Sequence, residues 1–274
     1  MTADFHMHTQ ASDGRLTYQD VIDEVKAQGL EVFAITDHDT TVDTAKQLAY
    51  AKKRGLKMIP GIELSTEHLG KSVHVLGYFK GEGYQSPGML AYAKELKEKR
   101  ERRAKAMIKR LKEYHDISIT YDDLLRHANG VIARPHLAKA INERYPKLTH
   151  DEIFDTLIGN DSKVYIPTAK MSTEEGIAFL KSHGAMVILA HPRLIHKKAH
   201  DAVLELPFDG IEVYYPRHDD THRERYLNHA KAKGWVISAG SDYHGIPGDT
   251  KHGHIGDERL SGEALEHFLS VLNA

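Results

Sequence analysis

Short apolar segments alternate with helix-forming segments over most of the chain, and this alternation limits the fold more than any other feature. Residues 31–36 (EVFAIT) and 186–190 (MVILA) are β-branched and apolar runs that predict buried strands. Parallel strands need crossover connections, so a repeated strand–helix order indicates βα units. Many such units in succession favour a closed or nearly closed barrel whose strand ends meet at one mouth. We therefore expect an α/β protein.

The expected elements of this barrel lie in two stretches of the chain. The expected strands cover residues 4–9, 31–36, 57–63, 73–78, 186–190, 210–214 and 235–240. The first expected helix begins after Asp20, and the others cover residues 46–54, 173–183, 219–233 and 262–272. The barrel domain is therefore assigned to residues 1–79 and 170–274.

The strand–helix rhythm breaks between residues 80 and 169, where helices follow one another. We expect helices at 89–114, 122–127, 135–143 and 151–157, and interpret this stretch as an all-helical insertion. The long first helix is strongly basic. Its charges fit either a solvated face or a surface that attracts phosphate or nucleic acid.

Composition narrows the chemistry. The chain of 274 residues has no cysteine, so a metal site must use nitrogen and oxygen ligands. A net charge of -2 argues against general binding to nucleic acid or membranes. Residues 1–4 lead directly into the first expected strand without a signal peptide, and no membrane span is expected. We therefore expect a cytoplasmic protein.

Histidines and carboxylates recur at or just beyond the ends of the expected strands. This set comprises His6, His8, Asp13, His38, Glu63, His74, His191, Asp242 and His244. Any one of them alone, and His74 in particular, could be an ordinary buried or capping residue. Together they would meet at the barrel mouth, and burying them without partners would cost several kcal/mol each. Metal binding is the natural way to satisfy them.

The size of this set predicts more than one metal ion. Catalytic sites usually keep three or four protein ligands and an open position, so three divalent ions fit the number of residues. Three such ions against three carboxylates leave a formal excess of about three positive charges, which favours an anionic substrate such as a phosphate ester. Neighbouring ions would generate a bridging hydroxide nucleophile and polarise the phosphoryl oxygens.

Several short motifs follow one another in a fixed order. They are His6-x-His8, Thr36-Asp37-His38, Gly61-Ile62-Glu63, His74, Ala190-His191-Pro192 and Ser241-Asp242-x-His244. This order resembles the PHP (polymerase and histidinol phosphatase) family of metal-dependent phosphoesterases over the whole chain except the insertion. The resemblance implies a distorted (β/α)7 barrel with a trinuclear Zn, Mn or Fe site.

The resemblance also implies a distribution of the ligands over three ions. His6, His8, Glu63 and Asp242 would hold the first ion. A bridging Glu63 with His74 and His191 would hold the second, and Asp13, His38 and His244 the third. All these positions are filled, which favours an active enzyme.

A second segment narrows the resemblance. Residues 132–138 contain Arg134-Pro135-His136, which resembles a segment of the subgroup that hydrolyses nucleoside 3',5'-bisphosphates and trims 5' nucleotides from short RNAs. The resemblance implies that Arg134 and His136 of this chain bind a phosphate of the substrate. The alternative is that Arg134 is a surface residue and Pro135 simply starts a helix. Further substrate contacts are expected after strand ends, at Ser65, Tyr214, Arg217 and His218.

These features predict a metal-dependent phosphatase or phosphodiesterase. Its expected substrates are small nucleotides, either a 3',5'-nucleoside bisphosphate or a nucleoside monophosphate, or RNA 5' ends. Histidinol-phosphate phosphatase is the nearest alternative because it shares the barrel and the metals. An amidohydrolase would leave Asp13, His38 and His244 unused, and a metal-binding regulatory module without turnover would tolerate missing ligands. No obligate protein partner is expected.

Overall fold

The computed structural model describes residues 1–127, 132, 134–167 and 170–274 of the chain. It divides into two compact units, one formed by Met1–Ala91 with Lys170–Ala274 and the other by Tyr92–Ala169. We call them the barrel unit and the helical unit. Ala133 of the Arg-Pro-His segment and Ala169, which ends the expected insertion, lie outside the described residues.

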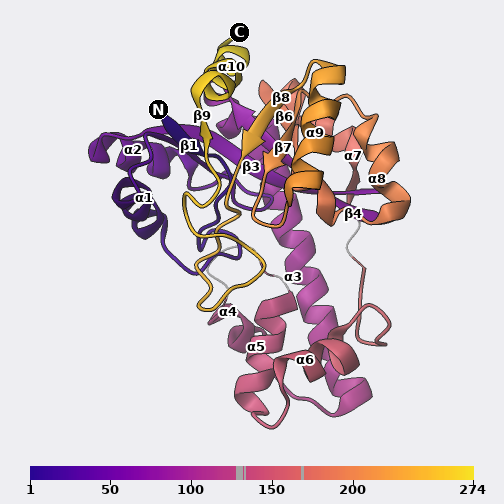
Figure 1. Cartoon of the computed structure of the whole chain (residues 1–274). Coiled ribbons are helices and arrows are strands. Elements are labelled where there is room, and N and C mark those ends of the chain that lie inside the picture. Colours follow the sequence, from indigo (N-terminus) through magenta and orange to yellow (C-terminus); the bar gives the residue numbers. More distant parts are fainter. Residues whose placement is uncertain (128–131, 133, 168–169) are drawn as a thin grey trace. The chain divides into compact units, whose positions relative to one another are not determined.

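The barrel unit is built on one mixed sheet (Figure 1). Its strands are β1 (Thr2–Asp4), β2 (Val32–Ile35), β3 (Lys57–His68), β4 (Lys71–Phe79), β5 (Met171–Ser172), β6 (Ala185–Leu189), β7 (Gly210–Tyr214), β8 (Val236–Ala239) and β9 (Leu260–Ser261). The sheet order is β8-β7-β6-β4-β3-β2-β1-β9, and the short β5 pairs with β3. Strands that are neighbours in the sheet are therefore consecutive along the chain, except at β5 and β9. These two short strands were not among the expected ones.

The two ends of this sheet are joined beyond the strands proper. The N–H of Phe5, just after β1, donates to the carbonyl of Ala239 at the end of β8, at 3.0 Å. Further along, Met7 forms a parallel bridge with Tyr243. These contacts close the ring, so the predicted distorted barrel is confirmed.

Strand β4 corrects the expectation of uniformly parallel strands. It runs antiparallel to both β3 and β6. Only Leu69 and Gly70 separate β3 from β4, and both have positive φ values, 49° and 68°. Such a two-residue turn makes a tight hairpin, which can join only antiparallel strands. The sequence signal was weak because leucine rarely adopts positive φ.

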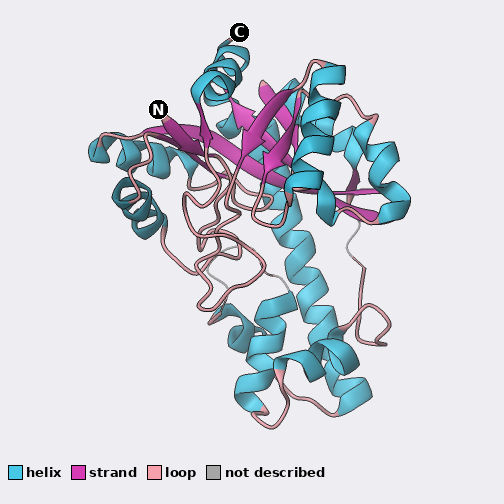
Figure 2. Cartoon of the chain, viewed as in Figure 1, coloured by secondary structure: helices cyan, strands magenta, loops and turns pink. Residues whose placement is uncertain are grey.

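Helices surround the strands of the barrel unit, and long loops gather at one end of them (Figure 2). The helices are α1 (Tyr18–Ala27), α2 (Thr44–Arg54), α7 (Thr173–Ser182), α8 (Lys197–Leu204), α9 (Asp220–Lys233) and α10 (Gly262–Asn273). Helix α8 was missed by sequence analysis. Strands β2 and β6 are buried along their whole length, as expected for parallel-type strands covered on both faces.

The core of the barrel unit is formed by apolar residues along several of its strands. It includes Ala3, Val32, Ile59 and Val236, and α10 packs against it. Phe268 of α10 is fully buried, and its ring stacks on that of Phe5 with centroids 4.4 Å apart. This stacking joins the last helix of the chain to the segment that follows β1.

The helical unit contains only helices and loops among its described residues. Its elements are α3 (Pro87–His115), which begins in the barrel unit, α4 (Tyr121–Leu125), α5 (Arg134–Arg144), α6 (His150–Glu152) and a π-helix (Ile153–Ile158). Ala104, Met107 and Leu111 of α3 are buried in the unit's own apolar core. No helix in the described part of the chain has the length and apolar character needed to cross a membrane.

Candidate metal centre

His6 and His8 lie just beyond the first strand rather than inside it. Strand β1 covers Thr2–Asp4, so it shares only Asp4 with the strand expected over residues 4–9, and that prediction is wrong in its bounds. The alternation of side chains nevertheless continues, because Met7 pairs with Tyr243 and the N–H of His8 donates to the Tyr243 carbonyl at 2.8 Å. As a result the His6 and His8 rings lie side by side, with centroids 5.2 Å apart.

His74 reaches the same region by a different route. It lies near the start of β4, where it pairs with Ser65 of β3. Because β4 is antiparallel, its beginning lies at the edge where the parallel strands end. The expectation that every strand delivers its carboxyl end to the mouth is therefore wrong for β4, although His74 still arrives there.

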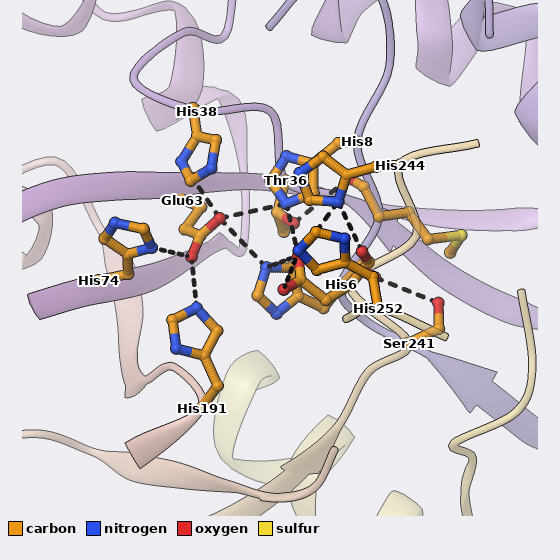
Figure 3. A network of polar contacts seen from close by, with 12 residues as sticks. His6, His8, Thr36, His38, Glu63, His74, His191, Ser241, His244 and His252 are labelled. Carbon is orange, nitrogen blue, oxygen red and sulfur yellow. Dashed lines mark hydrogen bonds and ion pairs between the residues drawn. The ribbon is translucent and has the colours of Figure 1, made fainter. Parts of the chain in front are cut away.

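Glu63 is the common neighbour of most of the predicted ligands (Figure 3). Its carboxylate is fully buried. The nearest ring nitrogens of His74, His191, His8, His6 and His38 lie 2.8, 3.0, 3.1, 3.2 and 3.2 Å from its oxygens. A buried carboxylate surrounded in this way can bridge two neighbouring cations.

The other two predicted carboxylates lie beside His6, His8 and His38 of this group and beside His244. Asp242 Oδ1 is 3.1 Å from His8 Nε2 and 3.3 Å from His6 Nε2. Asp13 Oδ1 is 3.3 Å from His244 Nε2, and its Oδ2 is 3.8 Å from His38 Nε2. The structure therefore brings all nine predicted ligands into one continuous cluster.

The donor atoms of this cluster fit divalent metal ions. Among the described residues, His6 Nε2, both ring nitrogens of His8, His38 Nδ1 and Glu63 Oε2 are buried without a hydrogen-bond partner. Groups whose ligand atoms all lie within 4.8 Å of one another are His6-His8-Glu63-Asp242, His8-Asp13-His38-His244, His38-Glu63-His74 and Asp242-His244-His252. Buried nitrogen and oxygen lone pairs that converge without hydrogen-bond donors are suited to cations.

Charges within the cluster shift the pKa values of its members. Burial opposes ionisation of Glu63, but His38, His6 and His74 outweigh it and hold the pKa of its carboxyl well below the usual range. Burial also opposes protonation of His8, but Asp242 and Glu63 raise its pKa to about 10. By contrast, burial lowers the pKa of His38 to about 4. The carboxylate is thus ready to bind a cation, whereas His8 must release a proton to do so.

The structure adds residues that sequence analysis did not select. Glu212 of β7 is fully buried, with Oε1 at 2.9 Å from His6 Nδ1. The Tyr215 hydroxyl donates to Asp242 at 3.2 Å. Glu212 was missed because it sits inside an apolar strand. It also reduces the predicted excess of positive charge from about three to about two.

His252 is a further neighbour of the cluster. Its ring stacks on that of His244 with centroids 4.2 Å apart, and its Nδ1 lies 2.6 Å from Asp249 Oδ2. A signal for it was available, since His252-Gly253-His254 repeats the spacing of the first histidine pair.

Two buried carboxylates hold the backbone that carries the ligands. Asp4 accepts hydrogen bonds from the N–H groups of His6 and Ser241 at 3.2 and 3.1 Å. Asp37 accepts from both the N–H and the hydroxyl of Thr9 at 2.7 Å, four residues before Asp13. Loops at the barrel mouth are therefore fixed by charge-assisted hydrogen bonds.

The predicted substrate contacts of the barrel unit lie in different surroundings. Ser65 is half-buried, and its N–H donates to Asp39 at 2.7 Å. Tyr214 packs against the apolar core, whereas its neighbour Tyr215 contacts Asp242. His218 is buried, with Nδ1 at 2.8 Å from the Val213 carbonyl. The carbonyl of Arg217 accepts a hydrogen bond from Arg193.

Arg134 and His136 lie at the start of α5 in the helical unit. Arg134 Nη1 donates to Asn160 Oδ1 at 2.8 Å, and its guanidinium lies over the ring of Tyr165, 5.1 Å from the centroid. Arg103 lies over the same ring at 5.6 Å. Burial and the charge of Arg134 lower the pKa of Arg103. This part of the helical unit is therefore strongly cationic.

Imidazoles and carboxylates that converge at one end of an α/β barrel are typical of metal-dependent hydrolases. The family model described as PHP domain matches residues 4–166. The chain belongs to this family, and the predicted resemblance is confirmed.

Named relatives extend over nearly the whole chain. The "3',5'-nucleoside bisphosphate phosphatase" of Chromobacterium violaceum is 30% identical over 90% of this chain and 88% of its own length. The "Phosphoribosyl 1,2-cyclic phosphate 1,2-diphosphodiesterase" of Eggerthella lenta is 27% identical, covering 92% and 97%. The "5'-3' exoribonuclease Rnm" of Salmonella typhimurium is 28% identical, covering 88% and 84%.

A solved structure also resembles the chain over nearly its whole length. It is a Bifidobacterium adolescentis protein inferred to be a metal-dependent phosphoesterase, with a TM-score of 0.82 and 30% identity over 98% of this chain and 95% of that one. The named relatives are all hydrolases of phosphoric esters. The predicted class of enzyme is therefore confirmed.

Proposed function

We propose that the barrel mouth is a trinuclear metal centre that hydrolyses a phosphate ester of a nucleotide. The observation that carries this proposal is the set of five imidazoles around the buried Glu63 carboxylate. The three proposed ligand sets are His6, His8, Glu63 and Asp242; Glu63, His74 and His191; and Asp13, His38 and His244. Since all the ligands are imidazoles and carboxylates, Mn, Zn and Fe each suit them.

When bound, divalent ions in such a centre supply a nucleophile derived from water and neutralise charge on the phosphoryl group. The protein's own part is to bring the ligands together and to orient them. In the metal-free cluster, neighbouring histidines hold the pKa of the Glu63 and Asp242 carboxyls well below the usual range, although burial opposes this. Both carboxylates are therefore ionised before a cation binds. The Tyr215 hydroxyl donates to Asp242 and so fixes the orientation of that carboxylate.

The proposed substrate is a 3',5'-nucleoside bisphosphate or the 5' end of a short RNA. The relatives named as a bisphosphate phosphatase and an exoribonuclease support this choice. Arg134 and His136 are proposed to bind a phosphate of the substrate, and the cationic surroundings of Arg134 support that role. A nucleoside monophosphate is the smaller alternative substrate.

Ser65, Tyr214 and His218 are the proposed substrate contacts of the barrel unit. His218 has the strongest structural support. Its Nδ1 donates to the Val213 carbonyl, which leaves Nε2 as an acceptor, and this buried atom has no hydrogen-bond partner among the described residues. A hydroxyl or amide N–H of a ligand could satisfy it.

The test is phosphate release by Mn²⁺-loaded protein from adenosine 3',5'-bisphosphate, AMP, histidinol phosphate and a ribose 1,2-cyclic phosphate in parallel. We expect the bisphosphate to be preferred, with loss of turnover in EDTA and in Asp242→Asn. The exposed Asp201→Asn is the matched control, because it keeps the cluster intact. Preference for histidinol phosphate or the cyclic phosphate would overturn the substrate class. No release of phosphate from any of them, together with no release of mononucleotides from a 5'-phosphorylated RNA, would favour a binding module without turnover.

The role of Arg134 is tested separately. Arg134→Ala should raise KM for the bisphosphate far more than for p-nitrophenyl phosphate, which has a single phosphate. Arg144→Ala, at the other end of α5 and paired with Asp123, is the control. Equal effects of Arg134→Ala on both substrates would show that Arg134 does not bind the second phosphate.

A further inference from the structure

Glu212 connects two of the predicted metal ligands that come from different strands. It lies in β7 and is fully buried. Its Oε1 lies 2.9 Å from His6 Nδ1, and its Oε2 accepts a hydrogen bond from the backbone N–H of His191 at 2.8 Å. We propose that Glu212 is a positioning residue. One of its oxygens sets the ring orientation and tautomer of His6, and the other fixes the backbone of His191. This inference rests on the proposed metal centre.

The hydrogen-bond chemistry determines which nitrogen of His6 is left for a metal ion. An ionised carboxylate can only accept, so His6 Nδ1 must carry the proton that is shared with Glu212. His6 Nε2 then has a free lone pair, and it lies 3.2 Å from Glu63 and 3.3 Å from Asp242. A carboxylate that holds the far nitrogen of a ligating histidine both orients the ring and raises its basicity.

The second contact acts on backbone that is held in an unusual conformation. His191 has a φ of 22°, which a non-glycine residue rarely adopts. Such conformations persist only where neighbouring groups hold them in place. The hydrogen bond from its N–H to Glu212 does this, and it keeps His191 Nε2 within 3.0 Å of Glu63.

The surrounding chain makes room for this arrangement. The pairing of β7 with β8 shifts register between Glu212 and Tyr214, an irregularity that can redirect a side chain. Next to it stands Gly240. A Cβ atom there would lie 2.2 Å from His6 Cβ and 2.8 Å from Glu212 Oε1, so a side chain would separate the two residues.

Glu212 is a positioning residue and not a further ligand in this geometry. Among the described residues, the groups whose ligand atoms lie within 4.8 Å of one another do not include it. Both of its oxygens instead receive donors, one each. Only a carboxylate can accept on both sides, because glutamine would place an NH₂ group against either His6 or the N–H of His191.

The experiment measures metal affinity separately from activity. Zn²⁺ and Mn²⁺ binding are measured by competition with a chromogenic chelator for the wild type, Glu212→Gln and Glu205→Gln. Glu205 is a surface residue paired with Lys233 and serves as the control. We expect Glu212→Gln to weaken metal binding about 10- to 100-fold, the range typical of residues that support a ligand. Glu205→Gln should bind like the wild type.

The thermal stability of the metal-free proteins distinguishes positioning from a purely structural role. A Glu212→Gln variant with a lower Tm in EDTA but wild-type metal affinity would overturn the inference. If Glu212→Gln does not fold, Glu212→Asp takes its place, because it keeps both acceptors on a side chain one methylene shorter. It should weaken binding at least about fivefold, and unchanged affinity would overturn the inference. A wild-type protein that binds neither metal would instead refute the proposed function.

Discussion

Replacing Asp37 by alanine should destabilise the barrel unit measurably. The Asp37 carboxylate is buried and accepts four hydrogen bonds, from the N–H and hydroxyl of Thr9 at 2.7 Å, the Ser12 hydroxyl at 2.7 Å and the Gln47 amide at 3.2 Å. Alanine would leave the buried Thr9 N–H and the Gln47 amide without acceptors. Each such group costs about 1–3 kcal/mol, so we expect a loss of about 3 kcal/mol.

The predicted loss is large enough for a simple assay. At about 2–4 °C per kcal/mol for a chain of this size, Tm should fall by about 6–12 °C. Thermal unfolding in EDTA gives this value without the contribution of bound metal. The loop that Asp37 holds also carries Asp13, so metal binding by the third proposed ligand set should weaken together with stability.

Two comparison variants make the argument refutable. Asp37→Asn should cost only about 1 kcal/mol, because the hydroxyls and the Gln47 amide can reverse their roles and receive the new NH₂ group. Asp43→Ala removes an exposed pair with Lys46 and should cost less than about 1 kcal/mol. The reasoning fails if Asp37→Ala lowers Tm no more than Asp43→Ala does.

Three further outcomes are expected. Phe268→Ala should cost about 3–5 kcal/mol by emptying a buried ring position, whereas Val271→Ala on the same helix should change Tm little; equal shifts would contradict this. Burial lowers the pKa of His218 from 6.5 to about 4. As the pH decreases below 6.5, the unfolded chain therefore binds more protons than the folded protein, and the free energy of unfolding decreases. Between pH 7 and pH 5 this histidine should lower the free energy of unfolding by about 2 kcal/mol. His218→Asn should remove this part of the pH dependence, which chemical denaturation at the two pH values measures. Glu63→Ala should lower the bound metal measured by mass spectrometry, and a fully loaded variant would count against the bridging role.

The sequence predicted the strands of the barrel well where a short apolar run is bounded by polar or turn-forming residues. The apolar run at 210–214 matches β7 in full, and β2 and β6 differ from expectation only at their ends. The direction of β4 was not predictable, because it depends on a two-residue turn whose Leu69 gives little local signal. Helix α8 was missed for lack of a clear boundary, although its buried face is apolar apart from His200.

The candidate site divides in the same way. The ligand types could be read from the chain, because histidines and carboxylates placed just after buried strands have few other reasons to be there. The supporting residues could not. Glu212 lies 206 positions from His6, and inside a strand its side chain has two directions that only the closed barrel distinguishes.

By itself, the sequence determined the α/β class, the nitrogen and oxygen chemistry of the metal centre and the family to which the chain belongs. These follow from residue types and from spacing along the chain, which are local properties. The tertiary structure decided that Glu63 stands among five imidazoles, that β4 runs antiparallel and that Glu212 joins His6 to His191. Such contacts arise only when the ring of strands closes, because closure brings together residues whose positions no local pattern relates.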